Sequence, residues 1–341
     1  MNAKPTGPVP TLADVARHAN VSTATVSRCL NSPDQVVEKT RVKVLQAVRD
    51  LGYSPNFGAR ALAAKRTNTI GAIIPTMENA IFAKGLQAFQ EELGNHGQTL
   101  LVASSSYRPE LEEEQIRTLT ARGADALLLV GFDRTEAIYD FLASRSMPVL
   151  IAWAYRPDGA HVSIGFDNRG AMHDLALTIL GLGHRRIGYI SAPQAGNDRA
   201  RERILGVQAA IKTHGADADL KVVETPYSID NGRAAFGQLM SGEAPPTVVI
   251  CGNDVLAVGA LHMAKTMGLQ VPQDVSITGF DDMELAQVAD PALTTVRVPH
   301  GEMGQSAARM LVGMVRGKAM PQSVRLDTEL QFRDTLAPPS G

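Results

Sequence analysis

Residues 11–31 read TLADVARHANVSTATVSRCLN, and this stretch predicts two short helices joined by a turn. Thr11 can cap the first helix, with Asp14 in the acidic position of a capping box. The apolar residues that follow recur at the spacing of one helical face: Leu12, Val15, Ala16 and Ala19. After the turn, Ser22 can cap the second helix. The stretch therefore predicts a helical hairpin with one buried side.

The second helix has two different faces. Its apolar side consists of Ala24 in part, Val26, Cys29 and Leu30. Its other side is short, hydrogen-bonding and cationic, which suits the major groove of DNA. We expect three residues of the helix to lie over base edges: Thr23, Ala24 and Arg28. We expect four to bond phosphates: Ser22, Thr25, Ser27 and Asn31. The alternative is an ordinary helical hairpin with an exposed polar face.

The chain continues with a third amphipathic helix over residues 38–51, EKTRVKVLQAVRDL. We expect four of its residues to close a small core over the first two helices: Val42, Leu45, Val48 and Leu51. A turn, GYSPN, follows at residues 52–56, and then a short segment, FGARALAAKR. The strings DVARHANVSTATVSRCLN, VVEKTRVKVLQAV and GYSPNFGARALA, in this order, closely resemble the headpiece of the lactose/galactose-repressor (LacI/GalR) family of bacterial transcription regulators. The resemblance covers about residues 11–332.

The resemblance implies a helix-turn-helix DNA-binding domain at 11–55 and a hinge helix with linker at 56–67. The candidate DNA contacts then also include Tyr53, Asn56 and Leu62. In such a protein the hinge orders only on operator DNA, in a paired dimer, and Leu62 matches the leucine that enters the minor groove. A helix this short is marginal in water alone. The alternative is that Leu62 is a plain linker residue.

The 341 residues allow two or three domains, and 44% hydrophobic with 20% charged residues is a globular composition. The net charge of −2 is unevenly distributed. Residues 1–66 carry ten Lys and Arg against four Asp and Glu, a balance of +6, which leaves −8 for the rest. A basic segment on an acidic body fits a phosphate-binding surface confined to one end. Chance segregation is the alternative.

Two cysteines, Cys29 and Cys251, lie in different expected domains and suggest no disulfide framework or metal cluster. Residues 1–10 resemble a flexible tail and lack the apolar stretch of a signal peptide. No run approaches the roughly 20 apolar residues of a membrane span. These features lead us to expect a cytoplasmic protein with no membrane partner.

From residue 69 onward, apolar strands alternate with helical stretches. The expected strands are TIGAIIP, TLLVAS, ALLLVG and PVLIAW, followed by RIGYIS, LKVVET, TVVICG and VSITGF. This alternation predicts an α/β body of two doubly wound parallel-sheet subdomains. The resemblance implies a periplasmic-binding-protein-like body at 68–332 that binds an effector and dimerises. Its expected segments are lobe 1 at about 68–166 and 299–326, lobe 2 at about 167–297 and 327–332, and a C-terminal tail at 333–341.

The resemblance also assigns eight residues to an effector site between the lobes: Thr76, Ile81, Phe82, Trp153, Arg203, Tyr227, Asn253 and Asp281. An apolar wall opposite polar groups would suit a sugar-like molecule. Other roles stay open. Phe82 can be core, Trp153 can fill the space between lobes, and Asn253 can cap a helix. Arg203 and Asp281 can form a salt bridge without any ligand.

The sequence contains no HExxH, P-loop or GxSxG motif and no GxGxxG after a strand, so we expect no enzyme, metal or cofactor. The leading hypothesis is a homodimeric repressor of a small catabolic operon. It would bind palindromic operator DNA under the control of a sugar-like effector. SYRPELEEEQI, IGFDN and GLGHRRIGYI resemble the gluconate branch of the family and point weakly to a sugar acid. The alternatives are a solute-binding protein for a sugar transporter and an α/β enzyme.

Overall fold

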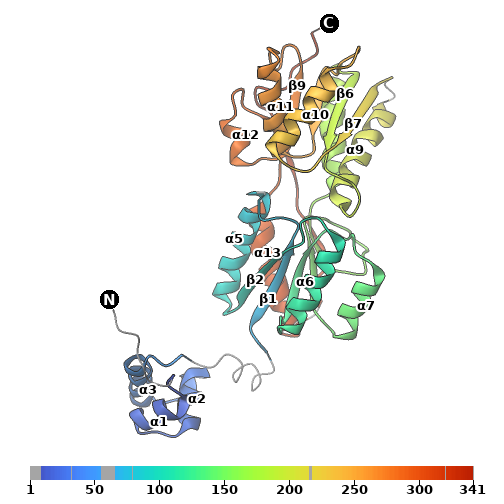
Figure 1. Ribbon diagram of the computed structural model, residues 1–341. Helices are drawn as coiled ribbons and strands as arrows, with labels where there is room; N and C mark the ends of the chain where they lie inside the picture. Colours follow the sequence, from blue (N-terminus) through green and yellow to red (C-terminus); the bar gives the residue numbers. More distant parts are fainter. Residues whose placement is uncertain are drawn as a thin grey trace. The chain divides into compact units, whose positions relative to one another are not determined.

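The structure is a computed structural model that describes residues 9–31, 33–54, 66–78, 80–214, 217–318 and 320–340. The chain divides into two compact units, Met1–Thr67, called the headpiece here, and Asn68–Gly341, called the body (Figure 1). Each unit is described by itself. None of the helices in the described ranges is long and apolar enough to cross a membrane.

The headpiece consists of short helices whose ends follow the local sequence. Its elements are α1 Leu12–Ala19, α2 Thr23–Asn31, a 3₁₀ turn Pro33–Gln35 and α3 Glu38–Leu51. The predicted capping box is confirmed: the Thr11 side chain accepts from the Asp14 N–H, and the Asp14 carboxylate accepts from the Thr11 N–H. Ser22 Oγ accepts from the Thr25 N–H at 3.1 Å and so caps α2, as expected.

The headpiece core corrects one expectation about α3. Val42 and Leu45 were expected to face inward, but their exposed fractions are 53% and 37%. Val44 and Ala47 are buried instead. Together with Val48 and Leu51, which pack at the edge of the core, they stand at i, i+3, i+4 and i+7. A stripe built only on steps of three drifts around a helix with 3.6 residues per turn, and this is why the expected face was misplaced.

The first lobe of the body is a six-stranded parallel sheet in the order β11-β5-β4-β3-β1-β2. Its strands are β1 Thr69–Ile74, β2 Thr99–Ser104, β3 Ala126–Val130, β4 Val149–Ala152, β5 Ser163–Gly165 and β11 Val324–Arg325. Its helices are α5 Ala80–Asn95, α6 Pro109–Ala121, α7 Glu136–Ser144 and α13 His300–Val315. Strands β1, β3 and β4 are buried along their whole length, because helices cover both faces.

The second lobe repeats this plan in the order β12-β10-β9-β8-β6-β7. Its strands are β6 Arg186–Ser191, β7 Asp219–Glu224, β8 Val248–Cys251, β9 Ser276–Asp281, β10 Thr294–Arg297 and β12 Glu329–Gln331. Its helices are α8 Asn168–Gly181, α9 Asp198–His214, α10 Ile229–Met240, α11 Asp254–Thr266 and α12 Glu284–Val288. The predicted fold class is confirmed, although β12 pairs antiparallel with β10 and four short strands (β5, β10, β11 and β12) were not foreseen.

The chain passes between the two lobes three times, after β5, after β10 and after β11. Helix α13 returns to the first lobe, as expected, and packs closely along α5. A Cβ atom at Gly304 would lie 2.1 Å from the Gly85 carbonyl oxygen, so glycine is required where the two helices meet. The segment at 333–341, expected as a C-terminal tail, is anchored on the second lobe: Thr335 is fully buried, and its carbonyl accepts from the Ile277 N–H at 2.9 Å.

Candidate functional sites

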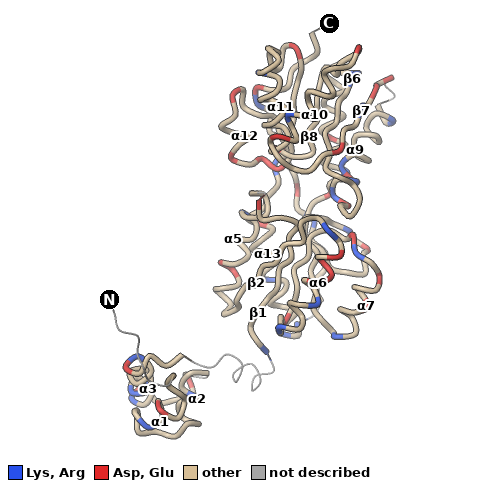
Figure 2. Tube along the Cα trace, viewed as in Figure 1, with Lys and Arg blue, Asp and Glu red and all other residues tan. Residues whose placement is uncertain are grey.

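Helix α2 presents the residues expected to read bases. Thr23, Ala24 and Arg28 are exposed, while Val26 and Cys29 on the opposite side are buried in the headpiece core. Arg28 forms no ion pair with any residue in the described part of the chain, so its guanidinium is available to a partner. Lys and Arg residues occur on all three headpiece helices (Figure 2). This face has the chemistry that a major groove requires.

The residues expected at phosphates form two local pairs. The hydroxyls of Ser22 and Thr25 lie 2.8 Å apart, and the Asn31 side-chain amide donates to Ser27 Oγ at 3.2 Å. In the first pair one hydroxyl donates to the other, which leaves one hydroxyl hydrogen for an outside acceptor. In the second pair the Ser27 hydroxyl hydrogen is left. Phosphate oxygens are acceptors, so each pair can supply a donor held in place by its neighbour.

The remaining expected DNA contacts lie beyond α3. Tyr53 is half-buried and packs against the headpiece core. Asn56 and Leu62, with most of the expected hinge, lie outside the described residues. The exposed face of α2 is therefore the part of the DNA-binding hypothesis that has a defined geometry.

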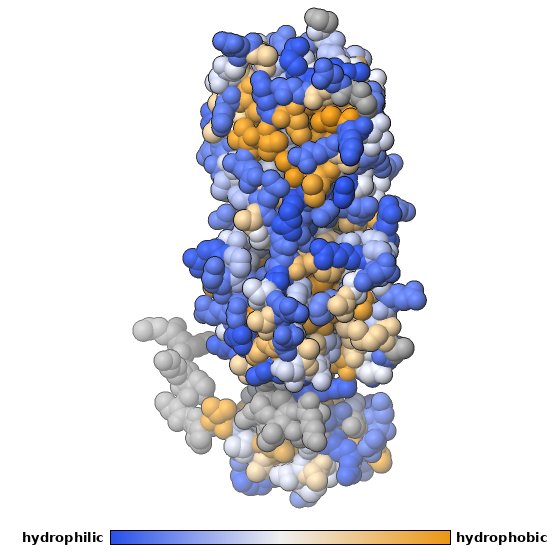
Figure 3. Space-filling view, turned by 90° about the vertical axis from the view of Figure 1, so that its right-hand side faces the viewer, coloured by the Kyte–Doolittle hydropathy of each residue, from blue (hydrophilic) through white to orange (hydrophobic). Residues whose placement is uncertain are grey.

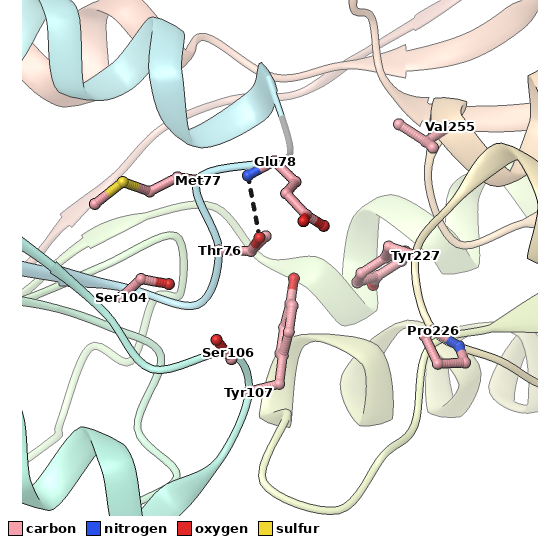
Figure 4. A pocket seen from close by; sticks show the side chains of 9 residues that line it. All are labelled: Thr76, Met77, Glu78, Ser104, Ser106, Tyr107, Pro226, Tyr227 and Val255. Atoms are coloured by element: carbon pink, nitrogen blue, oxygen red, sulfur yellow. Dashed lines mark hydrogen bonds between the residues drawn. The ribbon is translucent and has the colours of Figure 1, made fainter.

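The body contains a cavity of about 530 Å³ whose walls come from both lobes. Its lining residues are Thr76, Met77, Glu78, Ser104, Ser106, Tyr107, Pro226, Tyr227 and Val255. They follow the carboxyl ends of β1, β2, β7 and β8, the position expected for ligands in open α/β sheets. Tyr107 of the first lobe and Tyr227 of the second extend toward each other, with ring centroids 5.9 Å apart (Figure 4).

Asp281, at the end of β9, is 1% exposed, and neither carboxylate oxygen has a hydrogen-bond partner among the described residues. The nearest cations are too far for a hydrogen bond: Arg203 Nη2 lies 3.9 Å away and His300 Nε2 lies 3.8 Å away. Burial raises the pKa of Asp281 to about 7, although the Arg203 charge acts in the opposite direction. A buried carboxylate without hydrogen bonds destabilises the folded protein unless a ligand or another group donates to it.

Arg203, on α9, forms the ion pair with Asp281 that the sequence left open, at 3.9 Å, but makes its hydrogen bonds to other groups. Its Nε donates to Asn168 Oδ1 at 2.9 Å, and its Nη1 donates to the Gly252 carbonyl. Its guanidinium lies 3.8 Å from the centre of the Phe280 ring. Its partner Gly252 belongs to the loop that leads to Val255 in the cavity wall, so Arg203 lies near this wall. Burial raises the pKa of Tyr107 in the same wall.

The sequence left two roles open for Asn253, a helix cap and a ligand contact, and the structure shows the helix cap. Its Oδ1 accepts from the Leu256 N–H at 3.0 Å and caps α11, so the cap is present. Its buried Nδ2 has no partner in the part of the chain that the structure describes. Asp254 is structural: it accepts from the Met283 N–H and the Thr295 hydroxyl, and burial raises its pKa to about 8.

Three of the expected effector residues pack inside the first lobe. Ile81, Phe82 and Trp153 are buried in its apolar core, with the Phe82 and Trp153 rings edge to face at 5.3 Å. Of the eight expected residues, only Thr76 and Tyr227 line the described cavity. Arg203, Asn253 and Asp281 are buried at or beside the carboxyl ends of the second-lobe strands.

The sequence analysis overlooked several residues at these strand ends. Glu78, Ser106 and Tyr107 line the cavity, and Tyr107 follows β2 at the position where the strand-end rule would have found it. His300 follows β10 and is 2% exposed. It was missed because β10 had not been recognised as a strand. Tyr189, in the middle of β6, is buried with an unpartnered hydroxyl in the described structure and carries no sequence signal of its own.

Three further arginines near the two lobes' facing ends could attract an acidic ligand, but each already has a partner. Arg199 donates to Asp198 at 2.8 Å, and Arg156 stacks on the Phe132 ring at 4.3 Å. Arg201 bonds both oxygens of Asp133, at 2.7 and 2.9 Å. The last pair joins α9 of the second lobe to the loop after β3 of the first.

Comparison with known proteins agrees with both units. Residues 11–56 match the family described as "Bacterial regulatory proteins, lacI family", and residues 177–336 match the "Periplasmic binding protein-like domain". The chain is 33% identical over 336 residues to the HTH-type transcriptional repressor CytR of Escherichia coli K12, which covers 98% of both chains. It is 31% identical to the regulator GntR of the same organism, over 91% of this chain and 93% of that one.

Among solved structures, the lac repressor dimer bound to operator and the anti-inducer ONPF matches with a TM-score of 0.86 and 27% identity, covering 97% of this chain and 100% of that one. A helix-turn-helix headpiece and a two-lobed body with an interlobe cavity define a class of ligand-responsive DNA-binding proteins. The chain belongs to the lacI family of bacterial regulatory proteins. The relatives named here are transcription regulators and not enzymes.

Proposed function

We propose that this chain is a homodimeric repressor that acts in the cytoplasm, where the chromosome lies. It binds a palindromic operator through α2, and a sugar-like effector between its lobes controls its affinity for that operator. The observation that carries the proposal is the pairing of two features in one chain. The headpiece exposes Arg28 on its recognition helix, with no ion pair among the described residues. The body buries Asp281, whose carboxylate has no hydrogen-bond partner among the described residues, near an interlobe cavity.

The DNA contacts follow from the face of α2. Thr23, Ala24 and Arg28 are the base-reading residues, and Ser22, Thr25, Ser27 and Asn31 are the phosphate-binding ones, with Tyr53, Asn56 and Leu62 as further contacts. The expected domain arrangement is a tail at 1–10, the DNA-binding domain at 11–55, a hinge at 56–67 and the effector-binding body at 68–332. Two headpieces on one palindrome require two-fold symmetry, which dimers commonly have.

The surface of the body supports a dimer. Apolar residues gather on one face of the second lobe (Figure 3). Large apolar side chains are also exposed on separate elements of this lobe: Val222 on β7, Ile229 on α10, Met267 after α11, and Leu285 and Val288 on α12. Exposed apolar patches are typical of protein interfaces. The lac repressor structure that this chain resembles is a dimer bound to operator DNA.

The effector is proposed to be sugar-like, because the cavity combines hydroxyls with two aromatic rings. The proposed effector residues remain Thr76, Ile81, Phe82, Trp153, Arg203, Tyr227, Asn253 and Asp281. A sugar acid such as gluconate, and control of a catabolic operon, are the narrower form of the proposal. Arg203 is the cation available to such an acid, because Arg199 and Arg201 already have carboxylate partners.

The test is a DNA selection followed by an affinity measurement. Full-length protein selects fragments from a random double-stranded pool at physiological salt, and gel shifts then measure affinity with and without ribose, cellobiose or gluconate. We expect a palindromic consensus and a change in operator affinity of roughly 5–150-fold with one of the sugars. A change in either direction supports the proposal, because induction and corepression use the same parts.

Two results would count against the proposal. Selected fragments without a common sequence would remove the repressor function. A consensus operator whose affinity none of the three sugars changes would leave the DNA-binding function and remove the sugar effector. A response to gluconate, with no response to the two neutral sugars, would support the sugar-acid form.

A further inference from the structure

Five groups from both lobes form a nearly closed circuit of hydrogen bonds beside the cavity. Arg203 Nε donates to Asn168 Oδ1 at 2.9 Å, and Asn168 Nδ2 donates to the Trp153 carbonyl at 3.0 Å. Trp153 Nε1 donates to His300 Nδ1 at 3.3 Å. The last member, Asp281, faces His300 Nε2 at 3.8 Å and Arg203 Nη2 at 3.9 Å. The circuit is therefore hydrogen-bonded at three links and open at both links to Asp281.

The protonation of His300 follows from its position in the circuit. Because Nδ1 accepts from Trp153, the ring hydrogen of a neutral imidazole must lie on Nε2. Burial lowers the pKa of His300 to about 3, with the Lys84 and Arg203 charges acting in the same direction and the Asp281 main chain in the opposite one. His300 is thus neutral, and Nε2 is a buried donor with no hydrogen-bond partner in the described residues.

Backbone strain occurs at two members of the circuit. Trp153 has a φ of +59° and Asp281 a φ of +108°, values that L-residues rarely adopt. Such conformations persist only where the surrounding structure holds them, and they concentrate at ligand sites. Both residues stand where a strand ends: Trp153 directly follows β4, and Asp281 is the last residue of β9.

We propose that His300 is an effector-recognition residue. A hydroxyl group of the effector accepts a hydrogen bond from His300 Nε2, and a hydroxyl of the same molecule donates to Asp281. This inference rests on the proposed function and adds to it a residue and a ligand chemistry. A hydroxyl both donates and accepts, which matches one unpartnered donor and two unpartnered acceptors. A ligand carboxylate at this point would meet Asp281 with like charge and could donate nothing.

The proposed contacts also explain how effector binding can change the arrangement of the two lobes. His300 begins α13 of the first lobe and Asp281 ends β9 of the second. Asn168 and His300 stand directly after two of the three crossovers. A hydroxyl that bonds both Asp281 and His300 closes the link between these two residues, which belong to different lobes. It thereby favours one arrangement of the lobes, which is the differential affinity that effector control requires.

The experiment uses the full-length protein with ribose, cellobiose and gluconate as separate probes. Trp153 is the only tryptophan and bonds His300 directly, so its fluorescence reports binding. His300→Phe keeps a flat ring but removes the donor, and His300→Gln keeps an amide donor near Nε2. The matched control is His184→Phe, because His184 is also buried but bonds Thr247 Oγ1 and the Ala337 carbonyl.

Wild type should bind at least one of the three probes. We expect His300→Phe to lower the affinity for that probe by about 10-fold or more, because a probe hydroxyl loses the His300 Nε2 donor. His300→Gln should recover most of that loss, and His184→Phe should bind like wild type. Equal affinity in wild type and His300→Phe would overturn the role of His300 and leave the sugar effector in place. If wild type bound none of the three probes, the sugar effector and this inference would fall together.

Discussion

The functional surfaces of the headpiece and the body are built in opposite ways. In the headpiece the candidate residues lie in solvent: Arg28 and Thr23 are exposed on α2. In the body they are buried: Asp281 is 1% exposed, and His300 is 2% exposed. An exposed polar group is already hydrated, so it binds DNA by exchanging water for phosphates or bases. A buried unpartnered group has lost its water before any ligand arrives.

This difference separates the expected consequences of substitution. Changes on α2 should alter DNA binding and leave the stability of the free protein nearly unchanged, since surface substitutions usually have small effects on folding. Changes at the buried groups Asp281 and His300 should alter ligand binding. They should also alter the stability of the ligand-free protein, because a buried polar group without a hydrogen-bond partner is destabilising. Substitutions on α2 and at Asp281 test this contrast.

The largest effect is expected for Asp281→Ala. It removes both buried acceptors, so we expect the response of operator affinity to an effector sugar to be abolished, while DNA affinity without sugar stays close to wild type. At about 1.5–3 kcal/mol for each hydrogen bond to a charged group, affinity for the sugar should fall at least 10-fold. Fluorescence titration of Trp153 gives the sugar affinity and a gel shift gives the DNA affinity. An unchanged response would place the effector site elsewhere.

Arg28→Ala should reduce operator affinity by about 1–3 kcal/mol and relax the preference at one base pair in each half-site. Its melting temperature should match that of wild type, because the side chain is exposed. Lys212→Ala, on α9 of the body, removes the same charge as a control. Gel shifts on operator and on random DNA check the result. An equal loss on both DNAs would show that Arg28 contacts phosphate rather than a base.

The buried carboxylate should also be visible in the pH dependence of stability. The pKa of Asp281 is about 3.8 in an ordinary environment and is raised to about 7 by burial. The unfolded chain therefore releases this proton near pH 4 and the folded chain near pH 7. The contribution of Asp281 to the stability of the wild type falls through that interval and does not recover above it. Asp281→Asn lacks this loss. Its melting temperature relative to wild type should rise between pH 5 and pH 7.5, and a constant difference would contradict the raised pKa.

The smallest effect is expected for Ser27→Ala. The Ser27 hydroxyl accepts from Asn31, so its own hydrogen can reach a phosphate. Loss of one such bond should weaken binding by roughly 0.5–1.5 kcal/mol, equally for operator and random DNA. The same gel shifts measure it. A change in base preference would mean that Ser27 reads a base.

The sequence predicted the features that depend on local spacing. The Thr11 capping box, the Ser22 cap and the alternation of apolar strands with helices all agree with the structure. Spacing misled at α3, where Val42 fits a stripe nearly as well as Val44 does. The sequence pattern did not predict short strands such as β10, because three or four residues carry little periodic signal.

The candidate effector site shows the same division. A position after a strand can be read from sequence, and this placed Asp281 and Asn253 at strand ends. How deeply a side chain is buried and what it bonds depend on partners far away in the chain. Trp153 meets His300 across 147 positions, and no local pattern contains that contact. For this reason the sequence suggested Trp153 as a ligand wall but did not suggest His300.

The three crossovers between the lobes have a consequence for synthesis. The headpiece helices end at residue 51, so this unit is complete when most of the chain is still to be made. Neither lobe is complete until much later, because the first needs α13 and β11 and the second needs β12 and the buried Thr335. Domains fold as units while the ribosome proceeds from the N-terminus. A message cut short before residue 300 would thus yield a folded DNA-binding head on two unfinished sheets.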